Sequence, residues 1–163
     1  MIAVASPRIL VALLLLASVA IVGGALFSQY VGGLQPCELC LYQRWPYYAA
    51  IVATAVALLS GGDRAMRAVI MLCALLFAAS TALAFYHVGV EQHWFAGPSA
   101  CTGSVTGATS IEALKAQLLA RQPVSCDTPS WLLFGVSLAG WNLVSSVLLT
   151  VACAGALMPR GRQ

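Results

Sequence analysis

Four long apolar stretches constrain this chain more than any other feature of its sequence. They cover approximately residues 9–27, 47–59, 68–86 and 132–157. The first, third and fourth are each long enough to cross a hydrocarbon core of about 30 Å as a helix. The second reaches that length only if residues 41–46 belong to it. Because only 8% of the residues are charged and 61% are hydrophobic, a soluble domain of this length could not cover its surface.

The sequence therefore predicts an all-α membrane protein, a four-transmembrane-helix bundle that forms a single domain over residues 1–163. We expect the helices at about 9–27, 41–59, 68–87 and 131–157. The two longer connections are expected at about 28–40 and 88–130.

The basic residues indicate how such a bundle lies in its membrane. Five arginines lie in the two tails or in the turn at residues 60–67: Arg8, Arg64, Arg67, Arg160 and Arg162. By the positive-inside rule these segments face the cytoplasm, and an even number of spans puts both termini on that side. The loops at 28–40 and 88–130 then face outward. The net charge of +3 is spread over helix ends, so we expect no nucleic-acid partner.

The first apolar stretch also carries Ala17-Ser18-Val19-Ala20, which is similar to the small-residue cleavage site of a secretory signal. Its apolar run is longer than the roughly 7–15 residues usual for such a signal. We therefore expect the segment to remain in place as a helix.

Four of the six cysteines lie in the two outward loops, Cys37 and Cys40 in the first and Cys101 and Cys126 in the second. An even number of thiols per loop in an oxidising compartment is typical of disulfides. Two structural disulfides and a Cys₄ metal site are the alternatives. A zinc site usually uses two closely spaced pairs, and only one pair is close here, so we expect no metal. The other two cysteines lie in apolar runs and are expected to be small buried hydrophobes: Cys73 and Cys153.

The CxxC motif at residues 37–40 favours a reactive pair over a structural one, because a disulfide that closes so few residues gains little entropic stabilisation. Pro36 marks a helix start, and thiols at a helix N-terminus ionise more readily near the positive end of the helix dipole. Arg44 follows Cys40 by four residues, so on a continuous helix it would lie on the same face and stabilise a Cys40 thiolate. The alternative role for Arg44 is an interfacial anchor.

The second outward loop, residues 88–130, is too long to be a simple connector. The segment Thr109-Ser110-Ile111-Glu112 is typical of a capping box that opens a short amphipathic helix. This helix is expected to lie flat on the membrane or to pack on the first loop. His87, at the outward end of the third helix, is expected at the same membrane depth as Arg44, although a lone histidine is more often structural.

Three segments resemble the disulfide bond formation protein B (DsbB) family. The segment at 36–44 reads PCELCLYQR, the segment at 85–92 reads FYHVGVEQ, and Cys126-Asp127 is followed by WLLFG at 131–135. Together with the four spans and the second cysteine pair, the resemblance covers nearly the whole chain. Gln43 stands where an acidic residue is familiar in that family, which leaves its own role open.

The resemblance implies an enzyme, a protein-dithiol:quinone oxidoreductase of the bacterial inner membrane, multi-pass and with both termini cytoplasmic. Its partners would be a periplasmic thioredoxin-like oxidase of the DsbA type and the quinone pool of the lipid bilayer. Its cofactor would be a quinone, either ubiquinone or menaquinone. DsbA has a potential of about −120 mV, so thiol acceptors at about −200 to −270 mV would face an uphill transfer and a membrane oxidant is needed.

The resemblance also implies roles for individual residues. Cys37 and Cys40 would form the redox-active disulfide next to the quinone, with Cys40 in contact with it. Cys101 and Cys126 would form the second redox-active disulfide, with Cys101 making the mixed disulfide with the partner. Two further residues would support the quinone: Arg44 and His87.

Two other interpretations stay open at this point. A vitamin K epoxide reductase-like protein also combines four helices, a CxxC motif and a quinone, but its CxxC motif comes late in the chain, whereas here it comes early. A non-enzymatic membrane scaffold would use the same loop cysteines as mere cross-links, and it would form no mixed disulfide with a periplasmic oxidase.

Overall fold

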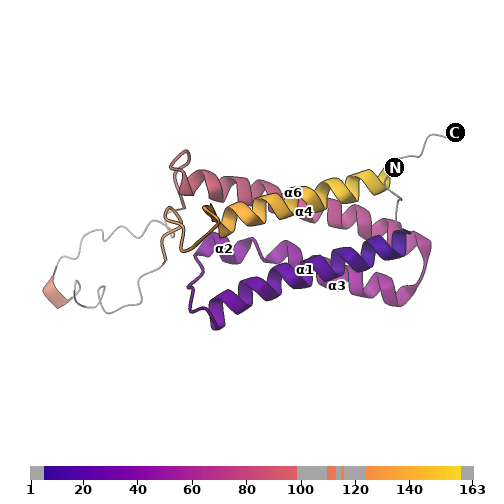
Figure 1. The fold of residues 1–163 in the computed structure, drawn as a ribbon, viewed down its shortest axis with the longest axis horizontal. Coiled ribbons are helices and arrows are strands. Elements are labelled where there is room, and N and C mark those ends of the chain that lie inside the picture. The colour runs from indigo at the N-terminus through magenta and orange to yellow at the C-terminus, as the bar shows by residue number, and fades with distance from the viewer. Residues whose placement is uncertain (1–5, 99–109, 113–114, 116–123, 159–163) are drawn as a thin grey trace.

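The computed structural model describes residues 6–98, 110–112, 115 and 124–158. Within them, four long helices run side by side along one axis (Figure 1). These are α1 (Pro7–Tyr30), α3 (Trp45–Ser60), α4 (Asp63–Glu91) and α6 (Leu138–Leu157). Helix α4 packs against α6 and α3, and α1 packs mainly against α3. The short helix α2 (Glu38–Tyr42) and a hairpin of β1 (Leu132–Leu133) and β2 (Val136–Ser137) lie at one end, called here the cysteine end.

The burial pattern of the bundle is that of a membrane protein. Helices α1, α4 and α6 are each long and apolar enough to cross a bilayer. Large apolar side chains on their outer faces stay exposed, among them Leu16 and Leu75, each 66% exposed. Between the helices a core is buried, including Tyr47 and Phe77. The prediction that Cys73 and Cys153 are buried is confirmed, since both are fully inaccessible.

The second predicted helix, residues 41–59, differs in the structure because it is two helices. The break falls at Gln43 and Arg44, which lie between α2 and α3. Pro46 has no N–H with which to bond the carbonyl of Tyr42, so the regular ladder cannot continue through this point. The Arg44 N–H instead bonds the Leu41 carbonyl three residues back, at 3.1 Å. Arg44 therefore does not share a continuous helix with Cys40, contrary to the sequence interpretation.

The fourth predicted helix, residues 131–157, begins seven residues later than expected, at Leu138. The residues before it form the hairpin, in which Leu132 pairs with Ser137 and Leu133 with Val136. Phe134 and Gly135 connect the strands with positive φ angles of 53° and 79°, the geometry of a tight two-residue turn. The Ser137 hydroxyl then caps α6 by accepting from the Gly140 N–H at 3.0 Å.

Helices α1 and α4 run past the predicted ranges of 9–27 and 68–87 at both ends. The Ser6 hydroxyl caps α1 by accepting from the Ile9 N–H at 3.4 Å. The amphipathic helix predicted from Thr109 lies for the most part outside the described residues, although Ile111, Glu112 and Lys115 are helical. Cys101 also lies outside them.

Candidate redox site at the cysteine end

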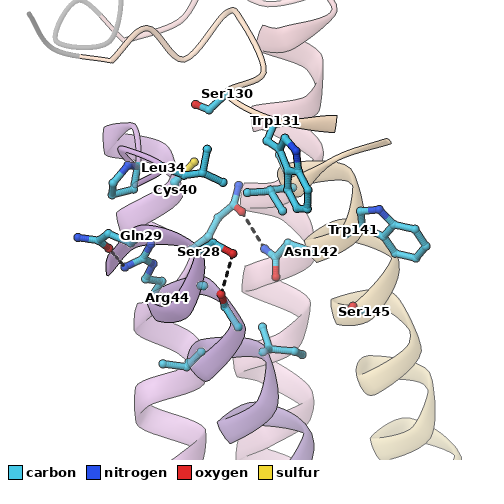
Figure 2. A pocket seen from close by; sticks show the side chains of 18 of the residues that line it. Ser28, Gln29, Leu34, Cys40, Arg44, Ser130, Trp131, Trp141, Asn142 and Ser145 are labelled. Carbon is cyan, nitrogen blue, oxygen red and sulfur yellow. Dashed lines mark hydrogen bonds between the residues drawn. The ribbon is translucent and has the colours of Figure 1, made fainter. Parts of the chain in front are cut away.

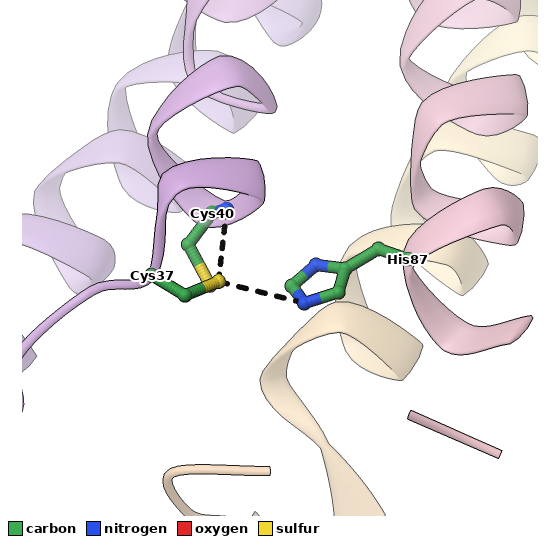
Figure 3. A group of neighbouring side chains, drawn as sticks. All are labelled: Cys37, Cys40 and His87. Atoms are coloured by element: carbon green, nitrogen blue, oxygen red, sulfur yellow. Dashed lines mark hydrogen bonds between the residues drawn. The ribbon is translucent and has the colours of Figure 1, made fainter. Parts of the chain in front are cut away.

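Cys37 and Cys40 are both reduced and lie next to each other at the start of α2 (Figure 3). Cys37 is the N-cap of α2, so its sulfur accepts from the Cys40 backbone N–H at 3.3 Å. The two sulfurs lie 2.9 Å apart and share a hydrogen bond. Cys37 is only 4% exposed. The CxxC motif thus folds into a compact dithiol, as its spacing predicts.

His87 approaches this dithiol from α4, with its Nε2 atom 3.5 Å from Cys37 Sγ (Figure 3). The imidazole is 2% exposed, so water does not compete for the contact. From the sequence, His87 was expected at the membrane depth of Arg44, and in the structure its direct contact is to Cys37.

The two thiols of the pair differ in pKa. The pKa of Cys37 falls from an ordinary 9.0 to about 5, chiefly because the Cys40 thiol donates to its sulfur. Burial opposes this effect, and the hydrogen bond with His87 lowers the pKa of Cys37 further. The pKa of Cys40 rises, first because its proton is held in the bond to Cys37 and then because the thiol is buried. In the reduced pair the thiolate therefore belongs to Cys37, whereas the sequence interpretation assigned it to Cys40.

A chain of polar side chains continues behind His87. The Gln43 amide nitrogen lies 2.9 Å from His87 Nδ1. The Asn142 amide on α6 donates to Gln43 Oε1 at 2.9 Å, and the Tyr47 hydroxyl on α3 donates to Asn142 Oδ1 at 2.7 Å. Sequence analysis left Gln43 without a role and did not name Asn142. The signal for Asn142 is a lone amide in an otherwise apolar helix.

Arg44 lies beside a cavity of about 360 Å³ (Figure 2). Its Nη1 atom donates to Gln29 Oε1 on α1 at 2.7 Å. Cys40 and Arg44 both line the cavity, and Trp131 and Asn142 line it from across (Figure 2). Most of the remaining lining is apolar, from α1, α6 and the hairpin. A mostly apolar cavity with a few polar groups is the usual form of a small-molecule site.

A carboxylate that the sequence did not single out as a site residue completes the surroundings of His87. Glu91 Oε1 lies 3.9 Å from His87 Nε2, one helical turn along α4. The Ser137 hydroxyl donates to Glu91 Oε2 at 2.5 Å, so the hairpin is tied to this end of α4. The Glu91 side chain is 7% exposed.

The second cysteine pair meets the first through Cys126. Cys126 is disulfide-bonded and 1% exposed, and its predicted partner Cys101 lies outside the described residues. Cys126 belongs to a buried cluster with Cys37, Leu39 and Val90. The fold therefore brings the two outward loops together at the redox pair, with Cys37 inside this cluster and Cys40 packed against it.

The donor atoms of Cys37, Cys40 and His87 lie within 4.8 Å of one another, so they could also hold a metal ion. The distance between the two sulfurs is that of a hydrogen bond rather than that of two ligands on one metal ion. The two sulfurs are 2.9 Å apart, whereas two thiolates on a tetrahedral zinc with bonds of about 2.3 Å would lie about 3.8 Å apart. The arrangement is that of a dithiol beside a histidine.

Comparison with known proteins identifies the family. The sequence model of the family described as "Disulfide bond formation protein DsbB" matches residues 7–156. The chain belongs to the DsbB family. Disulfide bond formation protein B of Stutzerimonas stutzeri (strain A1501) is 30% identical over 96% of this chain and 98% of its own length. Disulfide bond formation protein B 1 of Pseudomonas aeruginosa (strain PAO1) is 34% identical over 88% of this chain and 90% of its own length. No solved structure matches the chain significantly.

Membership confirms the resemblance drawn from the sequence and makes this chain a membrane protein of disulfide bond formation. It favours the DsbB interpretation over the vitamin K epoxide reductase-like one. Among the residues singled out for this DsbB chain, five gather at the cysteine end: Cys37, Cys40, Arg44, His87 and Cys126. Their individual roles are taken up in the proposal below.

Proposed function

We propose that this protein is a protein-dithiol:quinone oxidoreductase that reoxidises a periplasmic thioredoxin-like oxidase of the DsbA type and so sustains disulfide bond formation. Electrons pass from the partner to Cys101 and Cys126, then to Cys37 and Cys40, and then to a membrane quinone, ubiquinone or menaquinone. The observation that carries the proposal is the two-sided redox pair. Cys37 packs with Cys126, and Cys40 lines a cavity large enough for a quinone ring.

The proposal includes a topology with four crossings in the bacterial inner membrane and both termini in the cytoplasm. Helix α3 has 16 residues, which gives about 24 Å and falls short of a core of about 30 Å. The preceding turn and the end of α2 extend it toward the cysteine end, so residues 41–60 together provide the second crossing. Arg64 and Arg67 lie at the opposite end, beside the start of α1, which fits a cytoplasmic position for that end.

Each thiol exchange balances within the proposed route. A thiolate of the partner attacks Cys101, the Cys101–Cys126 bond breaks, and the partner's second thiol then closes the partner's disulfide. The Cys126 thiolate attacks Cys37, the Cys37–Cys40 bond breaks, and Cys40 leaves as a thiolate into the cavity. Cys101 then attacks Cys126 and restores the Cys101–Cys126 disulfide, which leaves Cys37 and Cys40 reduced.

The shared burial of Cys126 and Cys37 in one cluster supports this order of attack. Cys40 lines the cavity and is the leaving group in the proposed order. A quinone supplies the terminal acceptor of two electrons and two protons, the same number that the partner's two thiols give up. Cys40 and Cys37 return to the disulfide when those electrons leave.

The residues of the cavity fit a quinone. The apolar lining from α1, α6 and the hairpin suits an aromatic ring and its isoprenoid tail. Arg44 brings a permanent positive charge to the same cavity as Cys40, where it would hold a carbonyl oxygen and favour negative charge on it. Gln29 holds the guanidinium in this place from α1.

The acidity of Cys37 fits an oxidising pair. A thiolate that forms at about pH 5 rather than near 9 stabilises the reduced form of the pair at neutral pH. A stabilised reduced form makes the corresponding disulfide a stronger oxidant, which is the reason given for the high potential of DsbA itself. The Cys37–Cys40 disulfide must at least approach that potential to take electrons that come from DsbA.

The spectrum of a cysteine variant tests the proposal. In the Cys37→Ser protein, the thiol of Cys40 is freed from the bond that raises its pKa, so we expect a Cys40 thiolate in contact with added quinone and a visible absorption band from that contact. The Cys40→Ser protein is the matched control, because its remaining thiol faces His87 and not the cavity, and it should show no band. Absence of the band in Cys37→Ser, or an equal band in both variants, would contradict a quinone site at Cys40.

A further inference from the structure

Five side chains form a continuous line of hydrogen bonds. The line ends on Cys37 of the redox pair. The line runs from Tyr47 through Asn142, Gln43 and His87 to Cys37, with separations of 2.7, 2.9, 2.9 and 3.5 Å. Tyr47, Gln43 and His87 are 1%, 6% and 2% exposed, so these three members of the line are shielded from water, whereas Asn142 borders the cavity. Asn142 faces the interior of the cavity and His87 faces Cys37 (Figures 2 and 3).

The line fixes which nitrogen of His87 carries the proton. An amide nitrogen only donates hydrogen bonds, so the Gln43 nitrogen beside Nδ1 requires that Nδ1 carry no proton. A neutral imidazole has a single N–H, which then stands on Nε2. Nε2 faces Cys37 Sγ, so neutral His87 donates its proton toward the sulfur that holds the thiolate.

Gln43 cannot reverse its amide alone. Its Oε1 atom accepts from the Asn142 amide nitrogen, and Asn142 Oδ1 accepts from the Tyr47 hydroxyl. If only Gln43 turned over, its nitrogen would face the Asn142 nitrogen, and two donors would meet in a buried site. The orientation of Gln43 is therefore tied to that of Asn142.

We propose that Gln43 is a positioning residue for the redox pair, which together with Asn142 and Tyr47 holds neutral His87 in the Nε2–H tautomer. This inference deepens the proposed function and rests on it for its biological meaning. Its purpose there is to keep the imidazole a donor to Cys37 without making it an acid at Nδ1.

Among the groups that face His87, Gln43 is the one placed to control the tautomer of its ring. Cys37 and Cys40 approach from α2 and Glu91 from its own helix, and all three lie on the Nε2 side. On α3 the titratable group in the line is Tyr47, α6 contributes uncharged Asn142, and the hairpin contributes uncharged Ser137, which bonds Glu91. The guanidinium of Arg44 is bound to Gln29. Among the described residues, Gln43 is the side chain that bonds Nδ1.

The nitrogen NMR signals of the His87 ring test the inference, because they distinguish a protonated nitrogen from a bare one. The full-length protein is labelled with ¹⁵N-histidine, reduced, and held in lipid nanodiscs at neutral pH without quinone or partner. A His93→Gln variant assigns the signals, since the chain has two histidines. We expect a bare Nδ1 and a protonated Nε2. A protonated Nδ1 with a bare Nε2 in the wild-type protein would overturn the inference.

Three variants sharpen the result. In Gln43→Glu a carboxylate can only accept from Nδ1, so the Nδ1 signal should shift to the protonated position. In Gln43→Met, which keeps the size but removes both bonds, the two tautomers should mix and both ring signals should move toward intermediate positions. The matched control is Gln29→Glu, which adds the same charge at the same end but bonds Arg44 rather than His87, and it should leave both signals in place. Unchanged signals in both Gln43 variants would also overturn the inference.

The ring signals are read without any redox partner, so the two proposals fail separately. A protein with the Nε2–H tautomer that transfers no electrons to quinone would contradict the proposed function. A quinone-reducing protein with the Nδ1–H tautomer would contradict the inference about Gln43.

Discussion

At the scale of single residues, the central feature is how Cys37 and Cys40 share their protons. Cys37 receives the Cys40 thiol proton, the Cys40 backbone N–H and the contact from His87. Cys40 receives none of these and faces the cavity. In this arrangement the thiolate lies on Cys37 while both cysteines are reduced. It passes to Cys40 when Cys37 is joined to another sulfur.

The pH dependence of thiolate formation follows from this arrangement. In the reduced protein, ultraviolet thiolate absorbance should rise around pH 5, because the pKa of Cys37 is lowered from 9.0 to about 5. Below that pH Cys37 is protonated, and the extra stability of the reduced pair is lost. Cys40→Ala should move the step to higher pH, since the largest cause of the shift is removed. A step near pH 5 that survives in Cys37→Ala would contradict the assignment.

Arg44 provides the second prediction at this scale. Arg44→Ala should raise the apparent KM for quinone about tenfold or more, because a hydrogen bond to a charged group contributes about 1.5–3 kcal/mol and about 1.4 kcal/mol is tenfold. Arg44→Lys should recover part of the loss, since an ammonium keeps the charge but not the planar fork. The control is Arg67→Ala at the far end of α4. Unchanged quinone KM and turnover in Arg44→Ala would reduce this residue to an interfacial anchor.

The sequence predicts the local chemistry of the site better than its long-range contacts. Cys37, Cys40 and Arg44 stand out because they are close together in the chain and chemically unusual for its apolar setting. The bonds of Gln43 to His87 and Asn142 join residues 44 and 99 positions apart. Such contacts depend on how the helices pack, which spacing along one helix does not encode. The contact between His87 and Cys37 could not be predicted for the same reason, since His87 reaches Cys37 from another helix.

At the scale of elements, the sequence predicts which segments cross the membrane but not where each helix begins and ends. Hydrophobic length locates three membrane-crossing helices, but an apolar run does not reveal where helix gives way to another backbone. The hairpin at 132–137 is as apolar as the helix that follows it. Its signal was the glycine after Phe134, which permits a tight turn, and Ser137, which caps α6. Pro46 was the corresponding signal for the break between α2 and α3.

The hairpin turn gives a prediction at this scale. Gly135 has a φ of +79°, where any side chain is strained. Gly135→Ala should therefore lower the melting temperature by a few degrees, because the left-handed conformation costs a residue with Cβ about 1–2 kcal/mol. Gly23→Ala is the control. Gly23 lies inside α1 with open space around it, and alanine there should be neutral or stabilising by about 0.5–1 kcal/mol. Equal melting temperatures for the two variants would contradict the turn geometry.

At the scale of the whole molecule, the bundle holds two redox surfaces against each other at one end. The tie between Ser137 and Glu91 and the packing of Cys126 on Cys37 bring the second loop onto the first. The cavity opens on the other side of the pair, between α1, α6 and the hairpin. A protein arranged in this way can accept electrons from a soluble partner on one side and release them into the bilayer on the other.

The most direct measurement is the oxidation of a reduced DsbA-type partner by the purified protein in nanodiscs with quinone. The account predicts one quinone reduced for each partner disulfide formed. It also predicts that Cys101→Ser abolishes partner oxidation, while Cys37 and Cys40 in that variant still react with quinone after chemical reduction. Partner oxidation by Cys101→Ser at the wild-type rate, or by the wild-type protein at an equal rate without quinone or another electron acceptor, would contradict the relay.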